Sequence, residues 1–133
     1  NNVIVIADSC YSGIVFRSSG LPVVRLGQKN KEVLFRDLIE KRTRVALTSG
    51  GEEPVPDSVQ GGKHSVFAKS LMDVLKKNSL VLEANDLAKK VRDKVVFVTS
   101  SYRIKQTPKF VPITKAGHDD GDFLFVPANL QIK

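Results

Sequence analysis

The stretch VIVIADSCYSG, residues 3–13, decides how this chain is interpreted. Its apolar residues do not alternate with polar ones, which is the pattern of a strand buried on both faces of a parallel or mixed sheet. The strand, residues 2–7, runs into an aspartate, a serine and Cys10, the only cysteine in the chain. Ligands of open α/β sheets bind beyond the carboxyl ends of the strands. The sequence therefore places Cys10 where the chemistry of such folds takes place.

Length and composition limit the class of protein. The chain has 133 residues, 41% of them apolar, which fits one globular domain. No apolar run approaches the roughly 20 residues that span a bilayer, and the first residues lack the basic segment and cleavage site of a signal peptide. One unpaired cysteine argues against a disulfide-stapled secreted protein and suits a reducing compartment. We therefore expect a cytoplasmic protein with no membrane partner.

The net charge of +7 raises the question of a nucleic-acid partner. Residues 17–44 carry eight Lys and Arg side chains against three Asp and Glu, whereas the rest of the chain sums to +2. This segment has one aromatic residue, Phe35, and the chain has no Trp, so platforms for base stacking are scarce. We interpret the segment as a basic loop and expect no nucleic-acid partner.

The remaining elements follow from hydrophobic patterns and turn residues. After the first strand, the predicted elements are an amphipathic turn at 33–41, a buried strand at 44–49, helices at 65–77 and 84–96, and short strands at 109–113 and 122–126. Pro112 indicates that the strand at 109–113 is an edge strand or ends there. The apolar stripes of the two helices are assigned to the core and comprise Val66, Phe67, Leu71, Val74 and Leu75, then Leu87, Ala88, Val91 and Val95. This order predicts an α/β fold in which helices cover a sheet.

Asp8 and Cys10 are two residues apart in an extended segment, so their side chains project to the same side. A carboxylate beside a thiol disfavours the thiolate, so Asp8 does not activate Cys10. We interpret Asp8 as the receptor for a cation, which selects a substrate with a basic side chain next to the scissile bond. Activation of Cys10 then requires a histidine. The alternative role for Cys10, a small apolar residue packed at a strand end, fits poorly beside Asp8 and Ser9.

A series of motifs resembles the second half of a caspase-like domain, closest to the metacaspases and orthocaspases. DSCYSG resembles the nucleophile motif, RVALTSGGEE the strand that opens the small subunit, and GGKHSVFAKSLMDVLKKN the helix after it. ANDLAKKVRDKV, QTPKFVP and GDFLFV follow in the expected order. The resemblance implies the C-terminal part of a caspase-like (caspase-hemoglobinase) α/β sandwich, with a mixed, mostly parallel sheet flanked by helices. Residues 1–14 would be the nucleophile strand and turn, 15–42 an intersubunit linker-like loop, and 43–133 the small-subunit-like part.

The resemblance implies a cysteine endopeptidase that cleaves after Arg or Lys, with Cys10 as nucleophile and Asp8 in the S1 pocket. Thr48, Ser49 and the loop through Glu52 would flank the bound peptide, which pairs with the strand end as an added β-strand. The loop GGEEPVPD has no basic residue, unlike the loop with which caspases bind aspartate. Tyr11 stands where many metacaspases have histidine, which leaves the subfamily open.

The family's catalytic histidine precedes the cysteine by roughly 50 residues, whereas nine residues precede Cys10 here. We therefore expect a chain that is inactive alone and whose partner is an upstream large-subunit segment carrying that histidine. His64 is interpreted as a residue at the start of a helix, and His118 as part of a solvated turn. The aspartates beside His118 miss EF-hand spacing, so no metal site is assigned. No cofactor is expected, and the calcium activation of many metacaspases is assigned to no residue.

The linker-like segment offers sites for self-cleavage, because an acidic S1 pocket accepts its basic residues, which are Arg17, Arg25, Lys29, Lys31, Arg36 and Lys41. A second hypothesis is a non-catalytic caspase-like scaffold or regulatory subunit that binds a protein partner through the basic residues 17–44. A scaffold needs neither the nucleophile motif nor its acid. The sequence therefore favours the peptidase.

Overall fold

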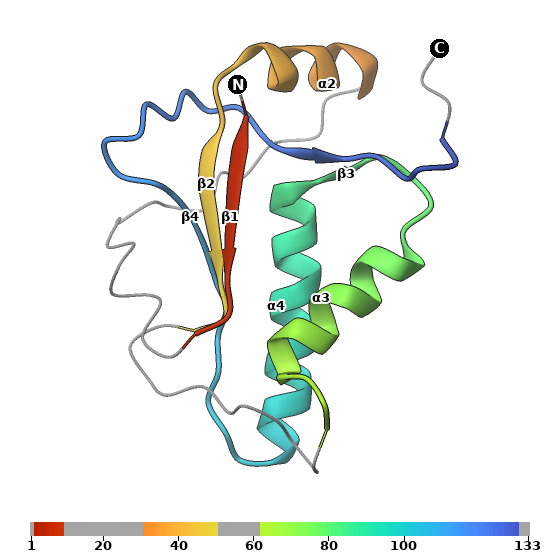
Figure 1. The fold of residues 1–133 in the computed structure, drawn as a ribbon, viewed down its shortest axis with the longest axis vertical. Helices are drawn as coiled ribbons and strands as arrows, with labels where there is room; N and C mark the ends of the chain where they lie inside the picture. Colours follow the sequence, from red (N-terminus) through yellow and green to blue (C-terminus); the bar gives the residue numbers. More distant parts are fainter. Residues whose placement is uncertain (1, 10–30, 51–61, 131–133) are drawn as a thin grey trace.

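The computed structural model describes residues 2–9, 31–50 and 62–130. Within them, the strands β1 (Val3–Ala7), β2 (Arg44–Thr48) and β4 (Lys109–Pro112) form one mixed sheet in the order β1-β2-β4 (Figure 1). β1 and β2 run parallel, and β4 runs antiparallel to β2. The protein is thus an α/β fold with a mixed sheet and helices, as predicted. β4 lies at the edge of this sheet and ends at Pro112, which confirms the prediction for that residue.

Two helices, α3 (Val66–Lys77) and α4 (Ala84–Ser101), pack against each other beside the sheet (Figure 1). α2 (Lys31–Glu40) precedes β2 and is a ten-residue helix, where the sequence predicted one amphipathic turn inside the linker-like loop. A separate two-stranded sheet pairs β3 (Leu82–Glu83), which was not predicted, with β5 (Leu124–Phe125). Among the described residues, no helix has the length and apolar character needed to cross a membrane.

The ends of both long helices have identifiable caps. Ser65 is the N-cap of α3, and its Oγ accepts a hydrogen bond of 2.9 Å from the Ala68 amide. The start of α4 is capped by a residue distant in sequence: Asp122 Oδ2, just before β5, accepts a hydrogen bond from the Asn85 amide. Asp122 is 2% exposed and its other oxygen accepts from the Phe123 amide. The start of α4 is therefore fixed by the segment that leads into β5.

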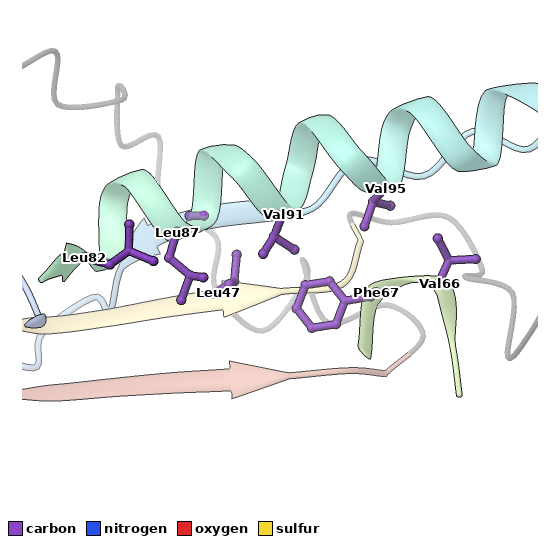
Figure 2. Close-up of a cluster of buried hydrophobic side chains, with 8 residues drawn as sticks. Leu47, Val66, Phe67, Leu82, Leu87, Val91 and Val95 are labelled. Carbon is purple, nitrogen blue, oxygen red and sulfur yellow. The ribbon is translucent and has the colours of Figure 1, made fainter. Parts of the chain in front are cut away.

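The core lies between the sheet and the two helices, and the predicted helical stripes form most of it. Figure 2 shows Leu87, Val91 and Val95 along α4, facing the side of Leu47 on β2 and Phe67 on α3. Leu87, Val91 and Val95 are fully buried, and Phe67 is 1% exposed. Burying one such side chain contributes about 1.5–3 kcal/mol. The helical layer therefore holds β2, the central strand, in place.

The prediction that the first strand is buried on both faces is wrong. β1 is an edge strand of the described sheet, and Val3, Val5 and Ile6 are 43%, 37% and 37% exposed. Val3 and Val5 lie on one face and Ile6 on the other, because side chains alternate along a strand. An apolar run indicates that a strand is suited to burial. Whether the strand is buried depends on a neighbouring element that covers it. Among the described residues, no strand pairs with the outer side of β1.

The loop between β4 and β5 anchors the beginning of β2. His118 Nδ1 accepts a hydrogen bond of 3.1 Å from the Arg44 amide, and the Asp119 amide donates to the Arg42 carbonyl at 2.8 Å. A Cβ on Gly121 would lie 2.5 Å from the Lys41 carbonyl oxygen, so only glycine permits this approach. The predicted solvated turn around His118 thus also has a structural role, because the half-buried His118 ring holds the beginning of the central strand.

Candidate functional site

The carboxyl ends of β1 and β2 lie side by side, since Ala7 is the register partner of Thr48. Asp8 follows β1, and Ser49 follows β2. The structure thus brings together Asp8, Thr48 and Ser49, three of the five side chains predicted for the site. Cys10 and Glu52 lie outside the described residues. The site can be built from the residues that lead up to the cysteine.

Ser49 fastens the end of β1 to the end of β2. Its amide donates to the Ala7 carbonyl at 2.9 Å, which continues the ladder between the two strands by one residue. Its hydroxyl accepts a hydrogen bond of 3.1 Å from the Ser9 amide and donates to the Ser9 carbonyl at 3.3 Å. A hydroxyl group can do both at once. The backbone of Ser9, which is joined by a peptide bond to Cys10, is therefore held on both sides.

Thr48 and Ser49 are fully buried, so their side chains contact other parts of the protein and not solvent. Thr48 Oγ1 donates to the Gly50 carbonyl at 3.2 Å, and the Ser49 hydroxyl is occupied by Ser9. The side chains of Thr48 and Ser49 are therefore committed to contacts within the protein. The flanking role of Thr48, Ser49 and Glu52 stays a prediction.

Gln106, which was not predicted as a site residue, stabilises the end of β2 by a hydrogen bond. It is 3% exposed, and its Nε2 donates to the Ser49 carbonyl at 2.8 Å. Gln106 precedes the Thr-Pro pair that leads into β4. A glutamine shortly before a proline gave only a weak signal, because polar residues are common in turns. Its carboxamide bridges 57 residues of sequence, a contact that no local pattern encodes.

Asp8 is exposed and accepts a hydrogen bond from the N-cap of α3. Ser65 Oγ donates to Asp8 Oδ2 at 2.5 Å. In Figure 1 the carboxyl ends of β1 and β2 lie at the lower end of the sheet, on the side from which α3 starts. The positive end of the helix dipole favours a negative charge at this position. Asp8 is thus an accessible carboxylate with one oxygen fixed by the protein, which suits the binding of a cation.

The two histidines lie apart in the structure. His64 is exposed and directly precedes Ser65, as predicted for a residue at the start of the helix. His118 binds the beginning of β2, whereas Asp8 and Ser49 lie beyond the ends of β1 and β2. Within residues 2–9, 31–50 and 62–130, no group of three His, Cys, Asp or Glu side chains is arranged to hold a metal ion.

Two surface depressions formed by described residues lie elsewhere. One, of about 460 Å³, is lined by polar groups that include Asn2, Arg42 and Asp119, at the beginning of β1 and β2. The other, of about 300 Å³, lies between α3 and α4 and contains the ion pair of Lys94 with Asp73. Neither depression includes Asp8 or Ser49. Neither depression is therefore the candidate site, which is defined by the adjoining ends of β1 and β2.

Asp8, two residues before a cysteine in sequence, can bind a basic side chain through its accessible carboxylate. Comparisons with protein-family models, with curated proteins and with solved structures find no match for this chain.

Proposed function

We propose that this chain is the C-terminal part of a caspase-like cysteine endopeptidase that cleaves after Arg or Lys. The observation that carries the proposal is the anchored strand end: Ser49 holds the backbone of Ser9, and Asp8 presents an accessible carboxylate two residues before the cysteine. Nucleophilic catalysis requires such fixed geometry between the attacking atom and the bound substrate. A binding scaffold has no need for a fixed carboxylate two residues before a cysteine.

The chemistry assigned to Cys10 is acyl transfer. Its thiolate attacks the carbonyl carbon of the basic residue, and the bond from this carbon to the nitrogen of the next residue then breaks as the amine leaves with a proton from a histidine. Water hydrolyses the resulting thioester and releases the new carboxylate. Asp8 takes no part in proton transfer. Its role is to bind the basic side chain by a charge-assisted hydrogen bond, so that the scissile carbonyl comes to rest beside the thiolate.

The catalytic histidine is proposed to come from a large-subunit segment that docks along the outer side of β1. Support comes from the exposure of Val3, Val5 and Ile6 on a strand whose outer side is unpaired among the described residues. Exposed apolar edge strands are sites of strand addition or aggregation. We use "complete domain" below for this chain together with that segment. The chain alone is expected to be inactive.

Self-cleavage is proposed within the linker-like residues 15–42. Peptidases bind their substrates in extended form, and Lys31 and Arg36 lie within α2, so cleavage after either requires that helix to unwind. Arg17, Arg25 and Lys29 precede the helix, and Lys41 follows it. N-terminal sequencing of the processed complete domain should locate the cut after one of these four residues.

The test of the proposed function is Asp8→Ala in the complete domain. Removing one partner of a charge pair between enzyme and substrate costs about 2–5 kcal/mol, so kcat/KM for an Arg peptide should fall roughly 30- to 5000-fold. Asp93→Ala is the matched control, because Asp93 is an exposed carboxylate on α4. Hydrolysis of Arg peptides that does not respond to Asp8→Ala, or cleavage after aspartate, contradicts the assignment of Asp8.

A further inference from the structure

Ser65 is placed to control the direction of the Asp8 carboxylate. Among the described residues, the hydrogen bond from Ser65 Oγ to Oδ2, at 2.5 Å, is the one that holds this side chain. The Asp8 side chain is exposed, so without a partner it would rotate about its side-chain torsions in water. A hydrogen bond to a charged group is stronger than one between neutral groups. It therefore selects one orientation of the carboxylate.

The Ser65 hydroxyl is itself fixed. Its oxygen accepts the Ala68 amide at 2.9 Å, so its single proton remains available for Asp8. The next two residues, Val66 and Phe67, are 7% and 1% exposed and belong to the core. The hydroxyl is thus attached to a helix that cannot shift without disturbing the core. One group caps α3 and connects it to the end of β1, across 57 residues of sequence.

We propose that Ser65 is a positioning residue for substrate specificity, which holds Asp8 in the orientation that receives a basic side chain. This inference rests on the proposed function. The bond to Ser65 occupies one lone pair of Oδ2 and leaves Oδ1 for the guanidinium or ammonium group of the substrate. Binding energy is then not spent on ordering the carboxylate, which is the effect of preorganisation. Ser65 does not itself touch the substrate.

The experiment compares three substitutions of Ser65 in the complete domain. Ser65→Thr retains a hydroxyl that can cap and donate, and it should keep kcat/KM for an Arg peptide within about twofold. Ser65→Gly retains most of the capping stability, since glycine is tolerated at an N-cap far better than alanine, but it has no donor. Ser65→Gly should lower kcat/KM about tenfold, mainly through KM. Ser65→Ala should show the same loss together with a lower melting temperature.

Two further readouts separate positioning from a structural role. Alkylation of Cys10 by iodoacetamide, which has no basic side chain, should proceed at the wild-type rate in Ser65→Gly. In the Asp8→Ala background, Ser65→Gly should change kcat/KM by less than about twofold, because the bond that it removes is already lost. Wild-type kcat/KM in Ser65→Gly, or a tenfold loss that persists without Asp8, overturns the inference.

Failure of the proposed function has a different signature. A complete domain that hydrolyses no Arg peptide, or that does so equally well with Asp8→Ala, removes the basis of both proposals. A complete domain that depends on Asp8 but not on Ser65 removes only the role of Ser65.

Discussion

β1 (VIVIA) and β2 (RVALT) are adjacent parallel strands, yet β1, the more apolar of the two, is the more exposed. In β2, Val45, Ala46 and Leu47 are 3%, 0% and 1% exposed, whereas Val5 and Ile6 in β1 are each 37% exposed. Ile6 is the register partner of Leu47 and therefore lies on the same face of the sheet. Leu47 is covered by α3 and α4, and Ile6 lies outside that core cluster. The difference comes from position in the sheet and not from the residues themselves.

β2 is fully surrounded by neighbouring elements within the described residues, and β1 is not. β2 has a strand on each side and a helical layer over it. β1 has one strand neighbour and apolar side chains open to solvent. The candidate site lies where the two strands end, at the boundary between the well-packed part and the open part. A further segment that docks on β1 would therefore reach the site directly.

The largest effect should come from truncating the buried member of the pair. Leu47→Ala should lower the free energy of unfolding by about 2–5 kcal/mol, because it removes a fully buried side chain and leaves a cavity. Ile6→Ala should cost less than half as much, since the Ile6 side chain is already partly in water. Urea unfolding of both variants measures the difference. Equal losses would show that the Ile6 side chain in β1 is as well packed as that of Leu47 in β2, which contradicts the difference in packing described above.

A charge on the open strand should act on assembly more than on stability. Val5→Lys should change the free energy of unfolding of this chain by less than about 1 kcal/mol, since lysine can keep its ammonium in water. The same substitution should prevent activation by the large-subunit segment, because lysine on an edge strand opposes pairing. Val33→Lys is the control, because Val33 is 51% exposed and lies on the helix α2, outside the sheet. Normal activation of Val5→Lys would place the docking surface elsewhere.

The smallest effect concerns the helical layer that covers β2. The Lys94 ammonium, which contacts Asp73 at 2.6 Å, holds the pKa of Asp73 below the usual value of an aspartate. A lowered pKa in the folded state means that the pair stabilises the fold above about pH 4 and that this contribution is lost as the pH falls further. Asp73→Asn should therefore lower the melting temperature slightly at pH 7 and not at all at pH 2. Asp93→Asn, at a more exposed pair, is the control.

The sequence predicted the parts of the fold that depend on local patterns. The stripes of α3 and α4 were predicted residue by residue, since a helix repeats its buried positions at a fixed spacing. The exposure of β1 could not be predicted, because an apolar run does not report whether a neighbouring element covers it. The end of α4 was placed too early, since Val98 and Thr99 continue the buried stripe past Val96 without a stop signal.

The candidate site was predicted in position but not in its connections. Asp8 was identified because it follows an apolar strand, and Ser49 because the resemblance to a caspase-like domain implied it. The bonds of Ser49 to Ser9 and of Ser65 to Asp8 span 40 and 57 residues, and that of His118 to Arg44 spans 74. Contacts between residues so far apart in sequence depend on how whole helices and strands pack. That packing cannot be predicted from local patterns in a single sequence. Ser65 had a local signal as a helix cap but none for its contact with Asp8.

The assignment of Cys10 as the nucleophile is tested most directly by covalent labelling of the complete domain with a peptidyl-arginine chloromethylketone, followed by peptide mapping. This reagent binds as an Arg substrate and then alkylates the attacking nucleophile. We expect one modified residue, Cys10, with complete loss of hydrolysis, no labelling in Cys10→Ala, and labelling slowed at least 30-fold in Asp8→Ala. Hydrolysis that continues in Cys10→Ala, or a label attached to another residue, would contradict the assignment of Cys10 as the nucleophile.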